Sequence, residues 1–218
     1  MKKYKAAIFD VDGTLLDTTE GVLAAVRYTI LEAGLSETDS QSLLSFIGPP
    51  IQDSFRRVYG VSAERAQELA GIFRNRYKDY DLLKAVPYTG IYDVMEGLRK
   101  KDVKIAVATY KRQDYAETIL KHFHFDAYSD ILYGADYENR LKKSDIIKLC
   151  LEKLQLPDPG DAVMIGDSLH DAKGAQALGM DFIGVTYGFG FRSEEEVYAY
   201  PAAGCAEVPA DILKLFIG

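Results

Sequence analysis

The stretch AAIFDVDGTLLDT, residues 6–18, decides how the rest of the chain is interpreted. Its first four residues are typical of a buried strand, and they run directly into Asp10, Asp12 and Gly13. Side chains at i and i+2 of an extended chain point the same way, so the carboxylates of Asp10 and Asp12 project from the strand end toward one point and repel each other. A packed core gains little from that repulsion. The stretch therefore indicates a strand whose end carries chemistry and requires a cation.

Apolar runs of strand character recur along the chain, with helical segments between them. They are AAIF at 6–9, KIAVAT at 104–109, DILYG at 130–134, AVMIG at 162–166 and DFIGVTY at 181–187. This alternation predicts an α/β fold with a doubly wound parallel sheet covered by helices on both faces. Ligands of such sheets bind beyond the carboxyl ends of the strands. We therefore expect the polar residues that follow three of the runs, at 10–14, 109 and 166–168, to line one crevice.

Residues 16–85 interrupt the alternation, because they show helical periodicity and no convincing strand. Helices are expected within 19–35 and within 62–80, the second opening with Ser62 as its cap. Between them FIGPPIQDSF, residues 46–55, contains two prolines that cannot continue a helix, which favours a loop. The predicted domains are a catalytic core, 1–15 with 86–218, and a small all-helical domain, 16–85.

The bulk composition argues against several classes of protein. A hydrophobic fraction of 48% and a charged fraction of 27% over 218 residues are ordinary for a globular chain with a sizeable core. The net charge of −7 argues against nucleic acid or a membrane surface as partner, because both attract basic surfaces. The two cysteines, Cys150 and Cys205, form no disulfide or zinc spacing, and the N-terminal apolar run is too short for a signal peptide. We expect a cytoplasmic protein.

Further aspartates lie where they would complete a metal site. Asp167 and Asp171 follow the expected strand at 162–166, and i/i+4 spacing at the start of a helix puts their carboxylates on one face. Mg²⁺ prefers hard oxygen ligands and tolerates several carboxylates. A helix cap is the alternative interpretation of Asp171. The candidate magnesium ligands are Asp10, Asp12, Asp167 and Asp171.

Other residues of the same crevice suit a phosphoryl group. Thr14 and Thr109 offer hydroxyls, and Gly13 permits close approach of the backbone. Lys142 or Lys143 brings a positive charge at the start of a helix. A phosphoryl group polarised by magnesium is open to attack by a carboxylate, and a neighbouring carboxylate can act as general acid and then as base. A DxDG stretch alone would fit a turn or a calcium-type loop, and the ordered set of motifs argues against both.

The motifs in this order resemble those of the haloacid dehalogenase superfamily of phosphatases, specifically its phosphoglycolate-phosphatase-like branch with a helical cap. The resemblance covers the whole chain. DVDGT at 10–14 resembles the first motif, Thr109 stands at the hydroxyl of the second, and GDSLHD at 166–171 resembles the fourth. The segment KSDII implies Lys143 as the lysine of the third motif, with Lys142 as the alternative.

The resemblance implies a role for each carboxylate. Asp10 would be the nucleophile and a magnesium ligand. Asp12 would be the general acid and base, with its main-chain carbonyl also on the metal. Asp167 would be a direct ligand, and Asp171 a direct or water-bridged one. Dehalogenases of the superfamily lack the second acidic residue of the first motif, so the presence of Asp12 favours phosphoryl chemistry over carbon-halogen hydrolysis.

The resemblance also implies residues that contact the substrate. Gly13 and Thr14 would lie against the phosphoryl group, and Tyr110 stands where many relatives have asparagine. Gly48, in the segment IGPP, lies where the family has a cap loop over the catalytic crevice. Arg56 would suit a carboxylate or a second phosphate. The predicted substrate-binding residues are Gly13, Thr14, Tyr110, Gly48 and Arg56.

The implied activity is magnesium-dependent hydrolysis of a small phosphomonoester through an aspartyl-phosphate, with phosphoglycolate as the first expectation. A phosphomutase of the β-phosphoglucomutase kind, and a 5'-nucleotidase or pyrophosphatase of the same superfamily, are alternatives that share these residues. A regulator that only binds a phosphorylated ligand would not need the complete set. A kinase with a GxxxxGK[ST] phosphate loop is disfavoured, because the chain has no such loop. We expect a monomer or weak homodimer, because the cap must swing.

Overall fold

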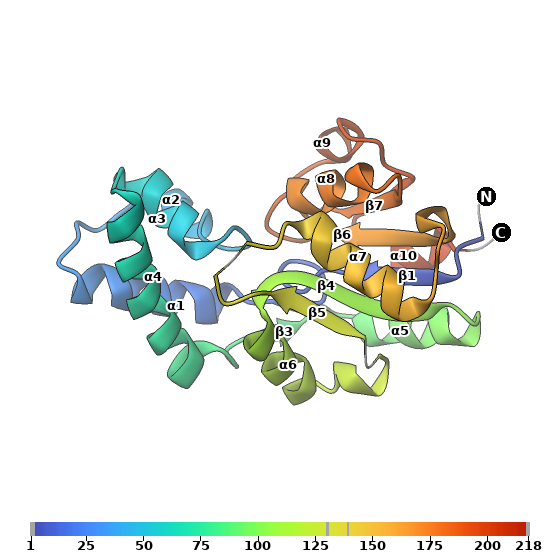
Figure 1. Ribbon diagram of the computed structural model, residues 1–218, viewed down its shortest axis with the longest axis horizontal. Helices are drawn as coiled ribbons and strands as arrows, with labels where there is room; N and C mark the ends of the chain where they lie inside the picture. Colours follow the sequence, from blue (N-terminus) through green and yellow to red (C-terminus); the bar gives the residue numbers. More distant parts are fainter. Residues whose placement is uncertain (1–2, 130, 139, 217–218) are drawn as a thin grey trace. The chain divides into compact units, whose positions relative to one another are not determined.

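The computed structural model describes residues 3–129, 131–138 and 140–216 (Figure 1). The chain divides into two compact units. We call Met1–Leu16 with Pro87–Gly218 the sheet unit, and Asp17–Val86 the helical unit. The two short strands β2, Leu16–Asp17, and β3, Val86–Pro87, pair where the chain passes from one unit to the other.

A parallel sheet of six strands organises the described part of the sheet unit. Its strand order is β5-β4-β1-β6-β7-β8, and each of these neighbours pairs in parallel. The bounds are β1 Ala6–Phe9, β4 Lys104–Arg112, β5 Leu132–Ala135, β6 Ala162–Gly166, β7 Asp181–Val185 and β8 Gly204–Ala206. The chain runs outward from β1 to β4 and β5 on one side and to β6, β7 and β8 on the other. The predicted α/β fold with a doubly wound parallel sheet is confirmed, and β1 lies at its switch point.

Helices cover both faces of the sheet (Figure 1). They are α5 Ile91–Lys100, α6 Gln113–His122, α7 Lys143–Leu154, α8 Leu169–Ala177, α9 Glu194–Tyr198 and α10 Pro209–Lys214, with short turns η2 Phe125–Ala127 and η3 Pro159–Asp161. Ala6 and Ile8 of β1 belong to one buried cluster with Ile147 of α7. Side chains alternate along a strand, so Ala7 and Phe9 face the opposite side of the sheet. All four residues of β1 have 0% exposure, which explains a run that is apolar without alternation.

The strand predictions differ from the structure in their ends. β4 continues to Arg112 beyond the expected end at Thr109, and its pairing with β5 shifts register between Ala108 and Arg112. Of the run expected at 130–134, residue 130 lies outside the described residues, and β5 occupies Leu132–Ala135. The edge strand β8 was not predicted, because GCA contains no β-branched or aromatic residue.

The helical unit contains α1 Thr19–Glu32, α2 Ser40–Leu44, α3 Ile51–Tyr59, α4 Ala63–Arg76 and a π-helical turn, η1, Tyr77–Asp81. Ser62 caps α4, where its side chain accepts a hydrogen bond from the backbone of Arg65 at 3.2 Å. The loop expected at 46–55 is wrong in its second half, because α3 begins at Ile51. Pro50 takes the N-cap position, which requires no backbone donor. Among the described helices, none combines the length and the apolar character that a bilayer-spanning helix requires.

Replacement of Ile8 tests the central position of β1. We expect Ile8→Ala to lower the free energy of unfolding by about 2–5 kcal/mol, because it removes buried methyl groups and leaves a cavity beneath α7. The measurement is urea unfolding followed by circular dichroism. The matched control is Val208→Ala, which truncates a side chain that is 51% exposed and should change the value by less than about 0.5 kcal/mol. Equal effects of the two changes would contradict the described core.

Candidate active site

Asp10 lies directly beyond the carboxyl end of the central strand. β1 ends at Phe9, and the backbone N–H of Asp10 donates to the carbonyl of Ile165 on β6 at 2.9 Å. The residue is buried with 7% exposure. Open α/β sheets bind their ligands beyond the carboxyl ends of the strands, at the point where the strand order reverses. The fold therefore places a buried carboxylate at the position where a ligand is expected.

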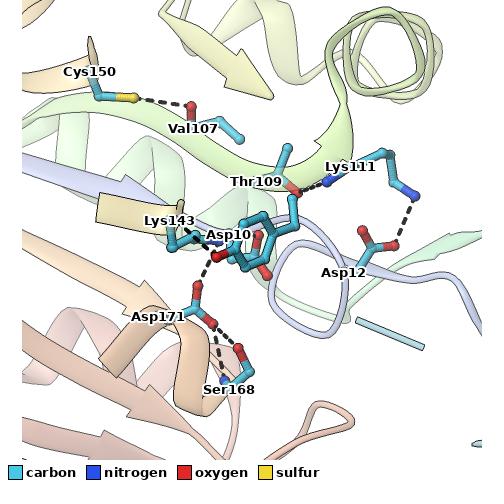
Figure 2. A network of polar contacts seen from close by, with 10 residues as sticks. Asp10, Asp12, Val107, Thr109, Lys111, Lys143, Cys150, Ser168 and Asp171 are labelled. Atoms are coloured by element: carbon cyan, nitrogen blue, oxygen red, sulfur yellow. Dashed lines mark hydrogen bonds and ion pairs between the residues drawn. The ribbon is translucent and has the colours of Figure 1, made fainter. Parts of the chain in front are cut away.

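Lys143 joins two of the carboxylates (Figure 2). It is the first residue of α7, and its Nζ lies 2.8 Å from Asp10 Oδ1 and 2.7 Å from Asp171 Oδ1. Its backbone N–H donates to the hydroxyl of Tyr110 at 2.9 Å, which fixes the start of the helix. Lys142 is the N-cap residue of the same helix, and its backbone N–H donates to Asp145 at 2.9 Å. Of the two lysines that the sequence left open, the structure brings Lys143 to the carboxylates.

Three buried aspartates form a cluster. Carboxylate oxygens of Asp10, Asp167 and Asp171 all lie within 4.8 Å of one another. Asp171 also helps to cap α8. Its Oδ2 accepts two hydrogen bonds from Ser168, one from the hydroxyl at 2.6 Å and one from the backbone N–H at 3.1 Å. The two interpretations of Asp171 are thus compatible: one oxygen serves the helix start and the other faces Lys143.

Backbone donors and glycines hold Asp167. Its Oδ2 accepts hydrogen bonds from the backbone N–H groups of Phe189 at 2.7 Å and Gly190 at 3.0 Å. A Cβ at Gly13, where φ is +81°, would lie 2.2 Å from the same oxygen, and a Cβ at Gly188 would lie 2.6 Å from it. These two positions therefore require glycine. The loop after β7 was not predicted to belong to the site, although its alternating glycines in YGFGF, residues 187–191, were a usable signal.

Burial dominates the electrostatics of the cluster. It raises the pKa of Asp10; Lys143 opposes this shift, and the neighbouring Asp171 adds to it. Burial raises the pKa of Asp167 to about 8, with further increases from Asp171 and Asp10 against the lowering effect of the backbone donors. Burial alone would lower the pKa of Lys143, but the carboxylates of Asp10 and Asp171 raise it above its ordinary value. The cluster thus has more carboxylates than one lysine neutralises.

The donor chemistry of this cluster fits Mg²⁺. Three carboxylates offer hard oxygen ligands, and a divalent cation would offset the burial and the mutual repulsion that raise the pKa values of Asp10 and Asp167. The residues that would hold the ion are Asp10, Asp167 and Asp171. The side chain of Asp12 is not one of the three, and the contact expected from its main-chain carbonyl stays a prediction.

The end of β4 brings three consecutive residues to the site. Thr109 is buried, and its Oγ1 accepts a hydrogen bond from the backbone N–H of Lys111 at 3.1 Å, so its own proton can be donated elsewhere. Tyr110 contacts α7 through the hydroxyl described above. The Nζ of Lys111 lies 3.0 Å from Asp12 Oδ1. The sequence analysis missed Lys111, although its position two residues after Thr109 on a strand predicts the same face.

Thr14, four residues after Asp10, offers a second hydroxyl. Thr14 is fully buried, with 0% exposure, and among the described residues its Oγ1 has no hydrogen-bond partner. Its carbonyl accepts a hydrogen bond from the hydroxyl of Tyr187 at 3.0 Å, so the turn after β1 is tied to the loop after β7. A buried hydroxyl without a protein partner is suited to a ligand oxygen.

Gly48 and Arg56 belong to the helical unit. Gly48 precedes the two prolines with φ +96°, and Arg56 lies on α3 with its side chain exposed. Neither belongs to the cluster of the sheet unit. Their contact with substrate stays a prediction.

Comparisons with known proteins give two relatives of similar length and one longer relative. The chain is 35% identical over 210 residues to a 5'-nucleotidase of Pseudomonas aeruginosa, covering 95% of this chain and 94% of that protein. It is 28% identical to the pyrophosphatase PpaX of Bacillus velezensis, covering 98% and 97% of the two chains. It is 32% identical to the tyrosine-protein kinase PtkA of Mycobacterium tuberculosis, covering 84% of this chain and 62% of that longer protein.

A solved structure and a family model agree with these relatives. A haloacid dehalogenase-like family hydrolase from Streptococcus pneumoniae matches with a TM-score of 0.91 and 30% identity, over 100% of both chains. The model of the haloacid dehalogenase-like hydrolases matches residues 7–185. That range includes the switch point, Lys143 and all four aspartates described above. The chain therefore belongs to the haloacid dehalogenase-like hydrolase family, as its four ordered motifs indicated.

Proposed function

We propose that the protein is a magnesium-dependent phosphomonoester hydrolase in which Asp10 receives the phosphoryl group. The observation that carries the proposal is the pairing of Asp10 with Lys143 at 2.8 Å beside two further buried carboxylates. A lysine is a point charge that suits a phosphate oxygen, and a carboxylate held at a strand end is a suitable nucleophile. Membership of a hydrolase family supports the same reaction class.

The reaction proceeds in two steps. The carboxylate of Asp10 attacks phosphorus, the bond from phosphorus to the ester oxygen breaks, and the carboxyl group of Asp12 gives its proton to the leaving alcohol. In the second step water attacks phosphorus, the Asp10–phosphate bond breaks, and Asp12 takes a proton from the water. Mg²⁺, held by Asp10, Asp167 and Asp171, would supply positive charge to the phosphoryl oxygens. The hydroxyl of Thr109 and the ammonium of Lys143 are donors for the same oxygens.

The substrate class rests on the relatives. The name of the Pseudomonas relative favours nucleoside 5'-monophosphates, and that of the Bacillus relative favours pyrophosphate. Phosphoglycolate, the first expectation from the motifs, has the same reacting group. These substrates differ only in the leaving group. We therefore propose a small phosphate ester or anhydride, with nucleoside 5'-monophosphates placed first because the nucleotidase is the more similar of these two relatives.

Asp10→Asn tests the nucleophile. We expect turnover of every ester to fall by at least about 10³-fold, because the amide oxygen is a poor nucleophile toward phosphorus. The measurement is phosphate release in the presence of Mg²⁺. The matched control is Asp102→Asn, which changes the same chemical group at a position with φ 58° that asparagine tolerates. Full turnover by the Asp10 variant would contradict the mechanism.

Removal of the metal tests the carboxylate cluster. We expect EDTA to abolish phosphate release and Mg²⁺ to restore it. Mg²⁺ should also raise the melting temperature of the wild type, because it binds the folded cluster and not the unfolded chain. In Asp167→Asn the Mg²⁺ concentration for half-maximal activity should rise at least about tenfold, because one charged ligand is lost. An unchanged metal requirement in this variant would exclude Asp167 from the metal site.

A substrate panel tests the leaving group. It contains adenosine 5'-monophosphate, pyrophosphate, phosphoglycolate, a hexose phosphate and 4-nitrophenyl phosphate. We expect the highest kcat/KM for the nucleotide, with release of free phosphate. A higher value for pyrophosphate or phosphoglycolate would replace the nucleotide as the proposed class. Conversion of the hexose phosphate into a positional isomer without free phosphate would instead identify a phosphomutase.

A further inference from the structure

Lys111 and Asp12 form an ion pair that the cluster around Lys143 does not include. The Nζ of Lys111 lies 3.0 Å from Asp12 Oδ1, and the two side chains are 6% and 12% exposed. Figure 2 shows Lys111 reaching from the end of β4 to Asp12, apart from the contacts of Lys143. Solvent screens a buried pair less than a surface salt bridge, and loss of one partner leaves an uncompensated buried charge.

Two contacts constrain the backbone of Lys111. Its N–H donates to Thr109 Oγ1 at 3.1 Å, and its carbonyl would lie 2.5 Å from a Cβ at Gly134 on β5, so that strand must carry glycine there. The register shift between Ala108 and Arg112 lies over the same residues. Irregularities of this kind re-aim side chains beside active sites. We infer that the backbone at the end of β4 restricts the direction of the Lys111 side chain.

The next cation along the chain has a different role. Arg112 makes a two-bond contact with Asp114, at 2.6 and 2.7 Å, and its guanidinium lies over the rings of Tyr115 and Tyr137 at 3.9 and 4.6 Å. Arg112 is thus bound within its own surroundings. Lys111 is instead directed toward the carboxylate of Asp12, in the turn that follows β1.

We propose that Lys111 is the positioning residue of the general acid and base. The inference rests on the proposed function, because it assigns proton transfer to Asp12. Asp12 precedes Gly13, whose φ of +81° turns the chain, and its carboxylate is repelled by Asp10 two residues earlier. The ammonium of Lys111 holds Asp12 Oδ1 against that repulsion. Lys143 and Lys111 thereby separate the nucleophile from the proton donor.

The effect of a misplaced Asp12 should depend on the leaving group of the substrate. An alkyl ester needs a proton on its departing oxygen, whereas 4-nitrophenolate departs without one. The parameter kcat/KM reports the first step alone, so it excludes the later hydrolysis of the aspartyl-phosphate. A misplaced Asp12 should therefore lower kcat/KM for alkyl esters more than for the aryl ester.

The test compares wild type, Lys111→Met and Lys111→Arg with 4-nitrophenyl phosphate and with the alkyl ester of the panel that is hydrolysed fastest. We expect Lys111→Met to lower kcat/KM by about 10²-fold for the alkyl ester and by less than about tenfold for the aryl ester. Lys111→Arg should restore most of the loss. On an Asp12→Asn background, Lys111→Met should cause little further loss, because both changes remove one function.

Two controls exclude a merely structural effect. Lys100→Met removes a lysine that is 72% exposed and should leave both values unchanged. The rise in melting temperature that Mg²⁺ causes should be the same in Lys111→Met as in wild type, since the cluster of Asp10, Asp167 and Asp171 is intact. Equal losses for both esters, or additive losses on the Asp12→Asn background, would overturn the proposal while the proposed function stands. Failure of the wild type to release phosphate from any substrate of the panel would overturn both.

Discussion

Repulsion among carboxylates at one end of the sheet is the constraint on which the rest of the structure depends. Asp10, Asp167 and Asp171 are buried within 4.8 Å of one another, and burial raises the pKa of Asp10 and of Asp167. A fold retains such a group only if cations and backbone donors hold it together. Lys143 supplies one charge, and the backbone of the loop after β7 supplies two hydrogen bonds. The remaining imbalance is what suits the cluster to a divalent cation.

The sheet could be predicted because its strands have a simple physical signature. β1 is buried on both faces, so four consecutive apolar residues ending at aspartate already indicated a buried strand of a parallel sheet. β8 lacked that signature, since its three residues pair at an edge and owe their conformation to β7. Helix α3 was missed for a different reason. Proline breaks a helix when it lies in the interior, so Pro50 was expected to prevent one. At the N-cap position no backbone N–H donor is required, and α3 therefore begins directly after Pro50.

The site could be predicted only where residue type and spacing determine geometry. The i and i+2 spacing of Asp10 and Asp12 placed both carboxylates at the strand end, but it said nothing of how they are kept apart. We propose that this depends on Lys111. The alternation of side chains along a strand predicts that Lys111 lies on the same face as Thr109, but the register shift in β4 and the close approach of Gly134 on β5 have no local sequence signal. The choice between Lys142 and Lys143 had the same origin. Both stand at a helix start. The resemblance favoured Lys143, and the packing of α7 against the sheet brings the ammonium of Lys143 to the carboxylates.

The separation of charges also explains why the site is assembled from so many elements. If Asp10 and Asp12 shared one cation, the proposed nucleophile and the proposed proton donor would compete for it, and each would disturb the other during the reaction. Two lysines from different elements remove that competition: Lys143 comes from the first turn of α7, and Lys111 from the last residues of β4. Because β4 is the immediate neighbour of β1 and α7 lies across both, each lysine is anchored by a rigid element. The switch point of a doubly wound sheet is where two such supports reach one strand end from different directions, so this fold can hold four acidic side chains in two separate sets.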